Sequence, residues 1–173
     1  IGTGDWSSDV CSSDLIAIVE ANLHMEPVGF QFEQEFIESL RCIPMEVRLK
    51  LDTCGVKLKL SHWHQFTQVE RQTLVTMACD CENSVWTYQH HLQALVTRYT
   101  GQPAKEISVA PVWLAPTVPD RVQQQAAAHN LTIAMERWQA LTSAQRFALI
   151  KLSRPSHENR NFILAMQEFG LAS

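Results

Sequence analysis

The segment from Arg41 to Leu74 contains several signals for helix ends, and it constrains the fold more than any other stretch. Pro44 suits the first turn of a helix, because its φ angle is already fixed and an N–H at that position would have no helical partner. Gly55 suits the residue just after that helix, where the backbone commonly turns left-handed. Thr67 and Glu70 have the spacing of a capping box that begins another helix. The segment therefore predicts helices joined by short connections.

The first of these helices has an apolar face. Val47, Leu51 and Cys54 recur at i, i+4 and i+7, which places them on one side of a helix. A cysteine on such a face is usually a small buried apolar side chain. We therefore expect Cys54 to belong to the core and not to act as a nucleophile.

A second segment, residues 119–149, repeats these signals at an offset of 75 residues (119 minus 44). Asn130 replaces Gly55, and asparagine is the next most common residue at a left-handed helix end. We interpret the two segments as diverged copies of one helical hairpin. The alternative is that two unrelated hairpins share the same generic helix-end residues. The identical pairs are Pro44 and Pro119, Val47 and Val122, Trp63 and Trp138, Thr67 and Thr142, Arg71 and Arg146, and Leu74 and Leu149.

The expected fold class is all-α. Residues 25–173 are predicted to form a single compact helical domain with two halves, 30–101 and 119–172. Between them, prolines at 103, 111 and 116 exclude a helix over residues 102–118. We expect an extended linker there, with a weak edge strand possible and Trp113 buried. The expected helices are a short one containing Phe36, Ile37 and Leu40, the one after Pro44, one after Thr67, one from Asp80 to Gly101, and four at 119–129, 133–140, 143–152 and 157–168.

The beginning of the chain differs in character from the rest. Residues 1–15, IGTGDWSSDVCSSDL, resemble the in-frame translation of a sequencing-library adapter. We therefore treat residues 1–24 as a non-native or disordered leader and leave them out of the fold argument. Met25 is the expected native start.

The charge of the chain argues against several classes of protein. The formal net charge is −4, with 18 acidic and 14 basic side chains, but four of the acidic ones lie in residues 1–24. The remainder is close to neutral, which does not suggest a nucleic-acid or membrane-surface binder. No apolar run approaches the ~20 residues of a membrane span, and no secretory signal is present. We expect a cytoplasmic protein with reduced cysteines.

Motifs for catalysis or metal binding are weak. Cys79 and Cys81, with His90 on the following helix, form the best metal candidate. The Cys-x-Cys spacing is shorter than in most zinc sites. Cysteines and histidines spaced in this way are more commonly ordinary loop and helix residues than metal ligands. There is no glycine-rich phosphate loop, HExxH or GxSxG motif, so no catalytic residue and no cofactor are expected.

Two polar regions are candidate binding surfaces. The basic side chains after Arg41 could receive an anionic ligand or an acidic patch of another protein. They could equally form a solvated face, balanced by Glu33, Glu35 and Glu38. Residues 157–161 are five consecutive polar residues, which suit either a partner surface or a polar clamp within the fold.

Two blocks of sequence resemble a known family. FQFEQEFIESLRCIPMEVRLKLDTCGVKL begins at Phe30, and RFALIKLSRPSHENRNF begins at Arg146 and is followed by EFGL. Together they are similar to the conserved nitrate reductase-associated protein family, over almost all of residues 30–172. The shared-block positions are Arg41, Cys42, Pro44, Arg48, Lys50, Asp52, Cys54, Gly55, Arg154, Pro155, His157, Glu158, Asn159 and Asn161.

The resemblance implies a small bacterial protein, best known in cyanobacteria, whose gene tends to accompany genes for nitrate reductase and molybdopterin synthesis. It supplies no catalytic residues. One hypothesis is an accessory protein that binds nitrate reductase or its molybdenum-cofactor maturation machinery. The other is a small-molecule or metal-binding module in nitrogen or molybdenum metabolism. The partner-binding candidates are Arg41, Arg48, Lys50, Asp52, His157, Glu158, Asn159 and Asn161.

Overall fold

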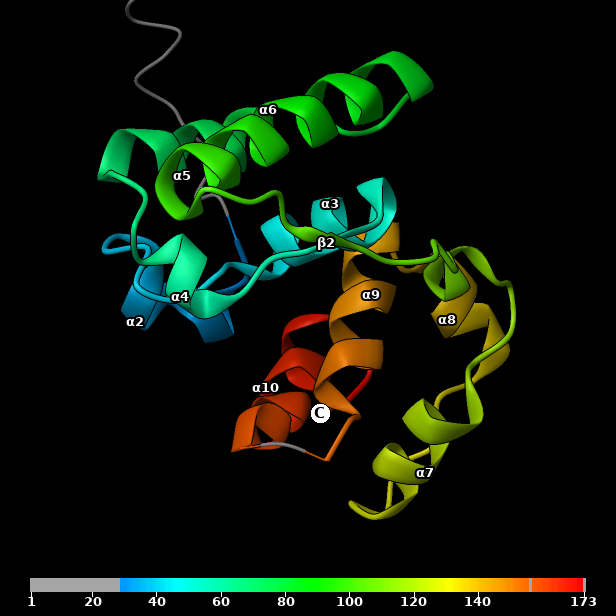
Figure 1. Cartoon of the computed structure of the whole chain (residues 1–173). Helices are drawn as coiled ribbons and strands as arrows, with labels where there is room; N and C mark the ends of the chain where they lie inside the picture. Colours follow the sequence, from blue (N-terminus) through cyan, green and yellow to red (C-terminus); the bar gives the residue numbers. More distant parts are fainter. Residues whose placement is uncertain (1–28, 156, 173) are drawn as a thin grey trace, which may run out of the picture.

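The computed structural model describes residues 29–155 and 157–172 of the 173-residue chain. The adapter-like leader, the expected start at Met25 and Ser156, the residue before the helix expected at 157–168, lie outside these residues. Within them the chain is mostly helical, with one small antiparallel sheet (Figure 1). The helical fold class predicted from the sequence is therefore confirmed.

The described elements follow the chain in this order: η1 (Gln31–Glu33), α2 (Gln34–Ile37), α3 (Met45–Cys54), β1 (Val56–Lys57), α4 (Leu60–Trp63), α5 (Gln68–Thr76), α6 (Glu82–Thr100), β2 (Lys105–Glu106), η2 (Val112–Leu114), α7 (Asp120–Ala127), α8 (Met135–Ala140), α9 (Ser143–Leu152), η3 (His157–Arg160) and α10 (Asn161–Glu168). In the sheet, Val56 is opposite Glu106 and Lys57 is opposite Lys105.

Helix α3 begins and ends where the sequence predicted. Pro44 is its N-cap, with φ −59°, and Gly55 follows it in the left-handed conformation, with φ 71°. The Gly55 N–H donates to the carbonyl of Leu51, which closes the last turn. The two ends of α3 are thus defined by the backbone preferences of Pro44 and Gly55.

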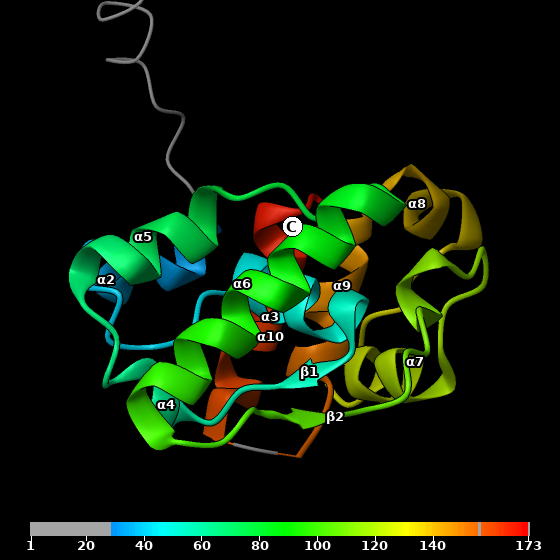
Figure 2. The ribbon, with the colours of Figure 1, turned by 45° about the horizontal axis from the view of Figure 1, so that its top comes forward.

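The core consists of two clusters, and α3 contributes to both. Val47, Leu51 and Cys54 pack in a cluster with Trp63, α5 and α6. Met45 and Leu49 instead join a cluster formed by α7, α8, α9 and α10. Figure 1 shows α5 and α6 at one end of the molecule and α9 and α10 at the other, with α3 between them. Figure 2 shows α6 running across α3, which it contacts directly.

Each half contains a tryptophan held by the same set of contacts. The indole N–H of Trp63 donates to the Leu40 carbonyl over 2.7 Å, and that of Trp138 donates to the Ala115 carbonyl over 3.2 Å. Both acceptors lie 23 residues before their tryptophan. Each tryptophan therefore ties a helix of its half to the segment that precedes that half's first long helix.

An arginine completes each set of contacts. Arg71 donates to the carbonyls of Trp63, Leu40 and His64 over 3.0–3.1 Å. Arg146 donates to the three carbonyls 75 residues later, those of Trp138, Ala115 and Gln139, over 2.9–3.4 Å. The guanidinium carbons lie 5.9 and 5.8 Å from the respective tryptophan ring centroids.

Residues at the helix ends also correspond at an offset of 75 residues. The capping boxes are Thr67 with Glu70 and Thr142 with Gln145. Asn130 has φ 59°, matching the left-handed Gly55.

Several local predictions were wrong. The possible strand of the linker was expected from the alternation of Ile107 with Val109 and of Val112 with Leu114, but it lies at Lys105–Glu106, where it pairs with β1 after the turn at Gly55. Residues 112–114 form a 3-10 helix, although Trp113 is buried as expected. The first short α-helix, α2, ends at Ile37, so Leu40 lies outside it with a φ of 47°, and α6 is capped at Cys81 and not at Asp80.

Glu33 is also misplaced by the sequence argument. It was expected, with Glu35 and Glu38, to balance the basic side chains of a solvated face, but it is 3% exposed. Its carboxylate accepts a 2.9 Å hydrogen bond from the N–H of Met45, at the first residue of α3. A buried carboxylate is favourable at this position because the N-terminal N–H groups of a helix lack helical partners and carry partial positive charge.

Candidate functional site

Helix α3 divides the predicted basic surface into two sides. Arg48 and Asp52, one helical turn apart, line a cleft on one side. Glu46 and Lys50, also one turn apart, line a cavity on the other side. The charged residues of α3, which are close together in the sequence, therefore lie at two separate sites.

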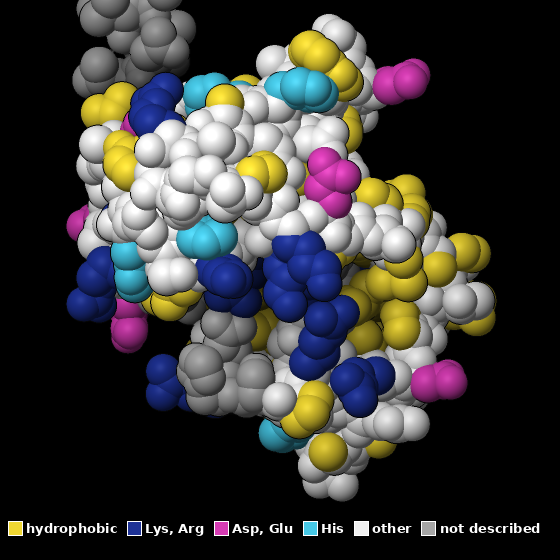
Figure 3. All heavy atoms as spheres, viewed as in Figure 1, with side chains coloured by type: hydrophobic (Ala, Val, Ile, Leu, Met, Phe, Trp, Pro, Cys, Tyr) yellow, Lys and Arg dark blue, Asp and Glu magenta, His cyan; other side chains and the backbone are white. Residues whose placement is uncertain are grey.

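The first site, here called the basic cleft, has a volume of about 870 Å³. It collects charged side chains from α3, β1 and the end of α9. Figure 3 shows lysine and arginine side chains gathered over the region between β2 and the α9–α10 end of the molecule. The described charged residues lining the cleft are Arg48, Asp52, Lys57, Lys151 and Arg154; Ile43, Leu51, Val56, Leu58 and Leu60 contribute apolar surface.

Positive charge is in excess in the basic cleft. Among its described lining residues, four basic side chains face one carboxylate. Asp52 is paired with Lys151 over 2.6 Å, and Lys151 also lies 5.0 Å from the ring centroid of Phe147. The Nε of Arg48 donates to the Ile43 carbonyl over 3.0 Å, which fixes the direction of the guanidinium. The cleft is therefore suited to bind an anionic group or an acidic surface.

The structure brings together some of the predicted site residues and separates others. Arg48 and Asp52 lie in the basic cleft with Arg154 and Pro155, so the two family-like blocks meet there. Arg41 is exposed and lines neither site, and its carbonyl lies 2.9 Å from Nε2 of His64.

One of the five polar residues 157–161 makes a hydrogen bond within the fold. The side-chain oxygen of Asn159 accepts a 2.7 Å hydrogen bond from Gln125, which links η3 to α7. Asn161 is the first residue of α10 and is half-buried. His157 and Glu158 lie in η3, but their side chains are outside the described part of the structure. Asn159 thus matches the polar-clamp alternative.

Sequence reasoning overlooked Lys57 and Lys151 as site residues. Lys57 is one of the basic side chains after Arg41 but was not singled out, and Lys151 lies near the end of the helix expected at 143–152. A basic residue in the last turn of a helix has an ordinary role beside the helix dipole, so the sequence gave no reason to select Lys151. Only the packing of α9 against α3 brings it to Asp52.

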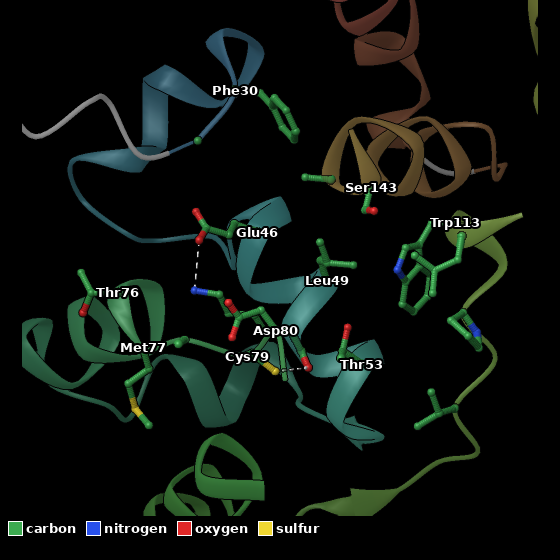
Figure 4. Close-up of a pocket in the computed structure, with 17 residues that line it drawn as sticks. Phe30, Glu46, Leu49, Thr53, Thr76, Met77, Cys79, Asp80, Trp113 and Ser143 are labelled. Carbon is green, nitrogen blue, oxygen red and sulfur yellow. Dashed lines mark hydrogen bonds and ion pairs between the residues drawn. The ribbon is translucent and has the colours of Figure 1, made fainter. Parts of the chain in front are cut away.

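The second site, here called the inter-half cavity, has a volume of about 820 Å³ (Figure 4). It lies between α3 and the α5–α6 connection on one side and the linker and the start of α9 on the other. Lys50 pairs with Glu46 over 3.0 Å and also donates to the Val75 carbonyl. The charge of Lys50 is thus balanced inside the protein.

The cysteine–histidine candidate does not form a ligand set. Among residues 29–155 and 157–172, no group of three or more His, Cys, Asp or Glu side chains is placed to hold a metal ion. The Cys79 thiol lies 3.8 Å from the Lys50 carbonyl, and burial raises its pKa to about 11. Cys81 is exposed, and the ring of His90 stacks on Trp86 with centroids 3.9 Å apart.

The comparison with known families explains why the two sequence blocks are informative. A family model described as conserved nitrate reductase-associated protein matches residues 29–169. The chain belongs to this family. The chain matches no curated protein and no solved structure. The family name links its members to nitrate reductase, and no described helix is long and apolar enough to cross a membrane.

Proposed function

We propose that this protein is an accessory factor of nitrate assimilation that binds nitrate reductase or a protein that matures its molybdenum cofactor. The basic cleft is the proposed docking site, and an acidic surface is the proposed counterpart. The observation that supports this choice is the meeting of Arg48 and Asp52 from one family-like block with Arg154 from the other, more than 100 residues later.

The charge distribution supports a protein partner more than a fixed internal role for the cleft. Asp52 compensates Lys151, but Lys57 and Arg154 are exposed at the edges of the site. Exposed basic side chains steer an acidic partner and fix its orientation, and such charges mainly affect the association rate. Leu58 and Leu60 border the same cleft and provide apolar contact area. Of the predicted partner-binding residues, we retain Arg48 and Asp52 for this surface, because both line the basic cleft.

The test uses the tagged full chain, expressed in a nitrate-grown bacterium that encodes the family. Nitrate reductase and cofactor-synthesis proteins are quantified by mass spectrometry in the purified sample. We expect nitrate reductase or a cofactor-synthesis protein to be enriched with the unchanged chain. The double change Lys57→Glu and Arg154→Glu should reduce this enrichment at least tenfold, because it converts attraction into repulsion at the cleft.

A matched control is available on α7. Arg121 is exposed and lines neither the basic cleft nor the inter-half cavity, so Arg121→Glu should leave the enrichment unchanged. The proposal is wrong if neither class of protein is enriched, or if the double change has no more effect than Arg121→Glu. Circular dichroism of each variant checks that the helical fold is kept.

The alternative function is a small-molecule or metal-binding module in nitrogen or molybdenum metabolism. The inter-half cavity favours the small-molecule form of this alternative, because its volume lies within the usual ~300–1,000 Å³ of ligand sites. Metal analysis of the same purified sample tests the metal form. Near-stoichiometric metal that is lost in Cys79→Ser with Cys81→Ser would support it and count against the accessory function.

We also propose that the two halves, 30–101 and 119–172, are diverged copies joined by the linker 102–118. The supporting observation is that two tryptophans, two arginines and their carbonyl acceptors repeat at the same offset. The copies differ in how the corresponding helices pack. In the first copy, α3 contributes to both core clusters, and the cleft and the cavity lie on its two sides. In the second copy, the corresponding helix α7 contributes to one cluster.

A further inference from the structure

The inter-half cavity combines apolar walls with polar groups that have no hydrogen-bond partner among the described residues. Its walls include Leu49 from α3, Met77 from the α5–α6 connection, and Val109 and Leu114 from the linker. Val109 and Leu114 are 50% and 59% exposed, so apolar surface remains open to water at this site. Surface of this kind, next to a cavity of ligand size, is typical of a binding site.

Trp113 supplies the first free polar group. The indole N–H groups of Trp63 and Trp138 both donate to backbone carbonyls. The Trp113 side chain is 5% exposed, and its N–H has no acceptor in the described part of the chain; Nε1 is not among the fully buried atoms without a partner, so it can be reached from the cavity. Figure 4 shows the indole at one side of the cavity, with its nitrogen on the edge turned towards Leu49 and Thr53. Because this N–H can be reached from the cavity and donates to no described residue, an acceptor on a ligand can replace water as its partner.

The ring of Trp113 is also held in place. It packs edge-on against Phe147, with centroids 5.2 Å apart and planes at 85°. This contact leaves the position of the indole N–H fixed by the core of the second half. A donor that is oriented before binding loses little conformational freedom when a ligand arrives.

Thr53 supplies the second group. Other helical threonines, such as Thr73 and Thr87, donate to the carbonyl four residues earlier. Thr53 lies in the last turn of α3, but among the described residues its hydroxyl makes no hydrogen bond. Figure 4 shows this oxygen pointing into the cavity. Ser143, at the start of α9, contributes a third hydroxyl without a described partner on the opposite side of the cavity.

The charges at the site limit the class of ligand. Lys50 is compensated by Glu46 and by a backbone carbonyl, and the Cys79 thiol is neutral because burial raises its pKa to about 11. Asp80 is exposed and accepts a 3.0 Å hydrogen bond from the Ser84 hydroxyl. Among the described lining residues, the one charge without an ion-pair partner is therefore the exposed Asp80 carboxylate, and the other polar groups at the apolar walls are one fixed donor and two hydroxyls.

We propose that the inter-half cavity binds a small, uncharged heteroaromatic molecule whose ring nitrogen or carbonyl accepts hydrogen bonds from Trp113 and Thr53. The rings lie against Leu49, Val109 and Leu114. This site is separate from the basic cleft, since no described residue lines both. It adds a ligand to the proposed accessory function and does not depend on it.

The test is a titration of the full chain with quinoline at neutral pH, followed by ¹H–¹⁵N NMR. The Trp113 indole N–H signal is identified by its loss in Trp113→Phe. Naphthalene is the matched probe, with the same two rings and no acceptor. We expect quinoline to shift the Trp113 signal in a saturable way and to bind several times more tightly than naphthalene. One hydrogen bond corresponds to a change in affinity of roughly two- to tenfold.

Two variants make the result specific. Thr53→Val keeps the shape of the side chain and removes its hydroxyl, so it should weaken quinoline binding about two- to tenfold and leave naphthalene unaffected. Thr132→Val, at an exposed threonine away from the cavity, should change neither. The proposal is overturned if quinoline does not shift the Trp113 signal. Equal binding of the two probes, or quinoline binding that neither Thr53→Val nor Trp113→Phe weakens, would overturn it as well.

Discussion

Replacing Arg71 with lysine tests whether the arginine–tryptophan contacts stabilise each half of the protein. Arg71 makes two partly buried hydrogen bonds, to the carbonyls of Trp63 and Leu40, and a more exposed one to His64. Lysine keeps the charge, but its single ammonium cannot reproduce the planar fork. The change should therefore remove two bonds while retaining the positive charge.

The expected loss follows from these contacts. Two hydrogen bonds at a net value of about 1 kcal/mol each, with a weakened cation–π contact of about 0.5 kcal/mol, give about 2–3 kcal/mol. The exposed bond to His64 is left out because water replaces it. For a chain of this length the melting temperature should fall by about 5–10 °C. The assay is urea unfolding followed by tryptophan fluorescence and circular dichroism.

The second half provides an internal replicate. Arg146→Lys removes the corresponding bonds to Trp138 and Ala115 and should cost the same within about 1 kcal/mol. Arg98→Lys is the control, since Arg98 is 68% exposed and makes only a surface ion pair with Glu70, worth at most about 1 kcal/mol. Losses below about 0.5 kcal/mol for both Arg71→Lys and Arg146→Lys would refute the reasoning. A large loss in only one of them would refute the equivalence of the two halves.

Three further measurements test single features of the fold. Gly55→Ala should lower the free energy of unfolding by about 2–4 kcal/mol in urea, because φ is 71° and the new Cβ would lie 2.8 Å from a backbone carbonyl oxygen. Gly101→Ala is the control: φ is 75° but no atom lies within 4 Å of the new Cβ, so the loss should be only about 1–2 kcal/mol. Equal losses for the two changes would contradict this reasoning. Thr142→Ala should cost about 1 kcal/mol by removing the capping box of α9, and an unchanged urea midpoint would show that the cap contributes nothing. Iodoacetamide at pH 8, followed by peptide mass spectrometry, should label Cys81 well before Cys54. Hydrogen bonding to Ser84 lowers the pKa of Cys81, whereas burial raises the pKa of Cys54 to about 12. Faster labelling of Cys54 would mean that the core opens at α3.

Local signals were sufficient to predict most helix ends. Pro44, Gly55 and Thr67 act through their own backbone or through neighbours a few residues away, so their roles can be read without knowing the fold. The helix at 143–152 was predicted with the bounds it has in the structure, since Thr142 and Gln145 define its start. The apolar spacing of Val47, Leu51 and Cys54 likewise identified the face of α3 that is buried.

The candidate sites depended on distances that the sequence does not contain. Arg48 and Lys50 are two residues apart, yet successive positions on a helix turn by about 100°, and the two side chains face different cavities. Lys151 contacts Asp52 only because α9 packs against α3. Glu33 was placed on the solvent side because its buried partner, the N–H of Met45, lies 12 residues later.

The sequence by itself determined the helical class, the helix ends and the family, because these depend on short-range backbone preferences and on recognisable blocks of residues. The tertiary structure alone decided which charges lie together, which buried tryptophan has an N–H without an acceptor among the described residues, and where a cleft and a cavity form. Trp63, Trp113 and Trp138 illustrate the difference: all three are buried, and only the surrounding packing leaves Trp113 with a donor directed into a cavity. Long-range packing sets these relations, since they join residues that are distant along the chain.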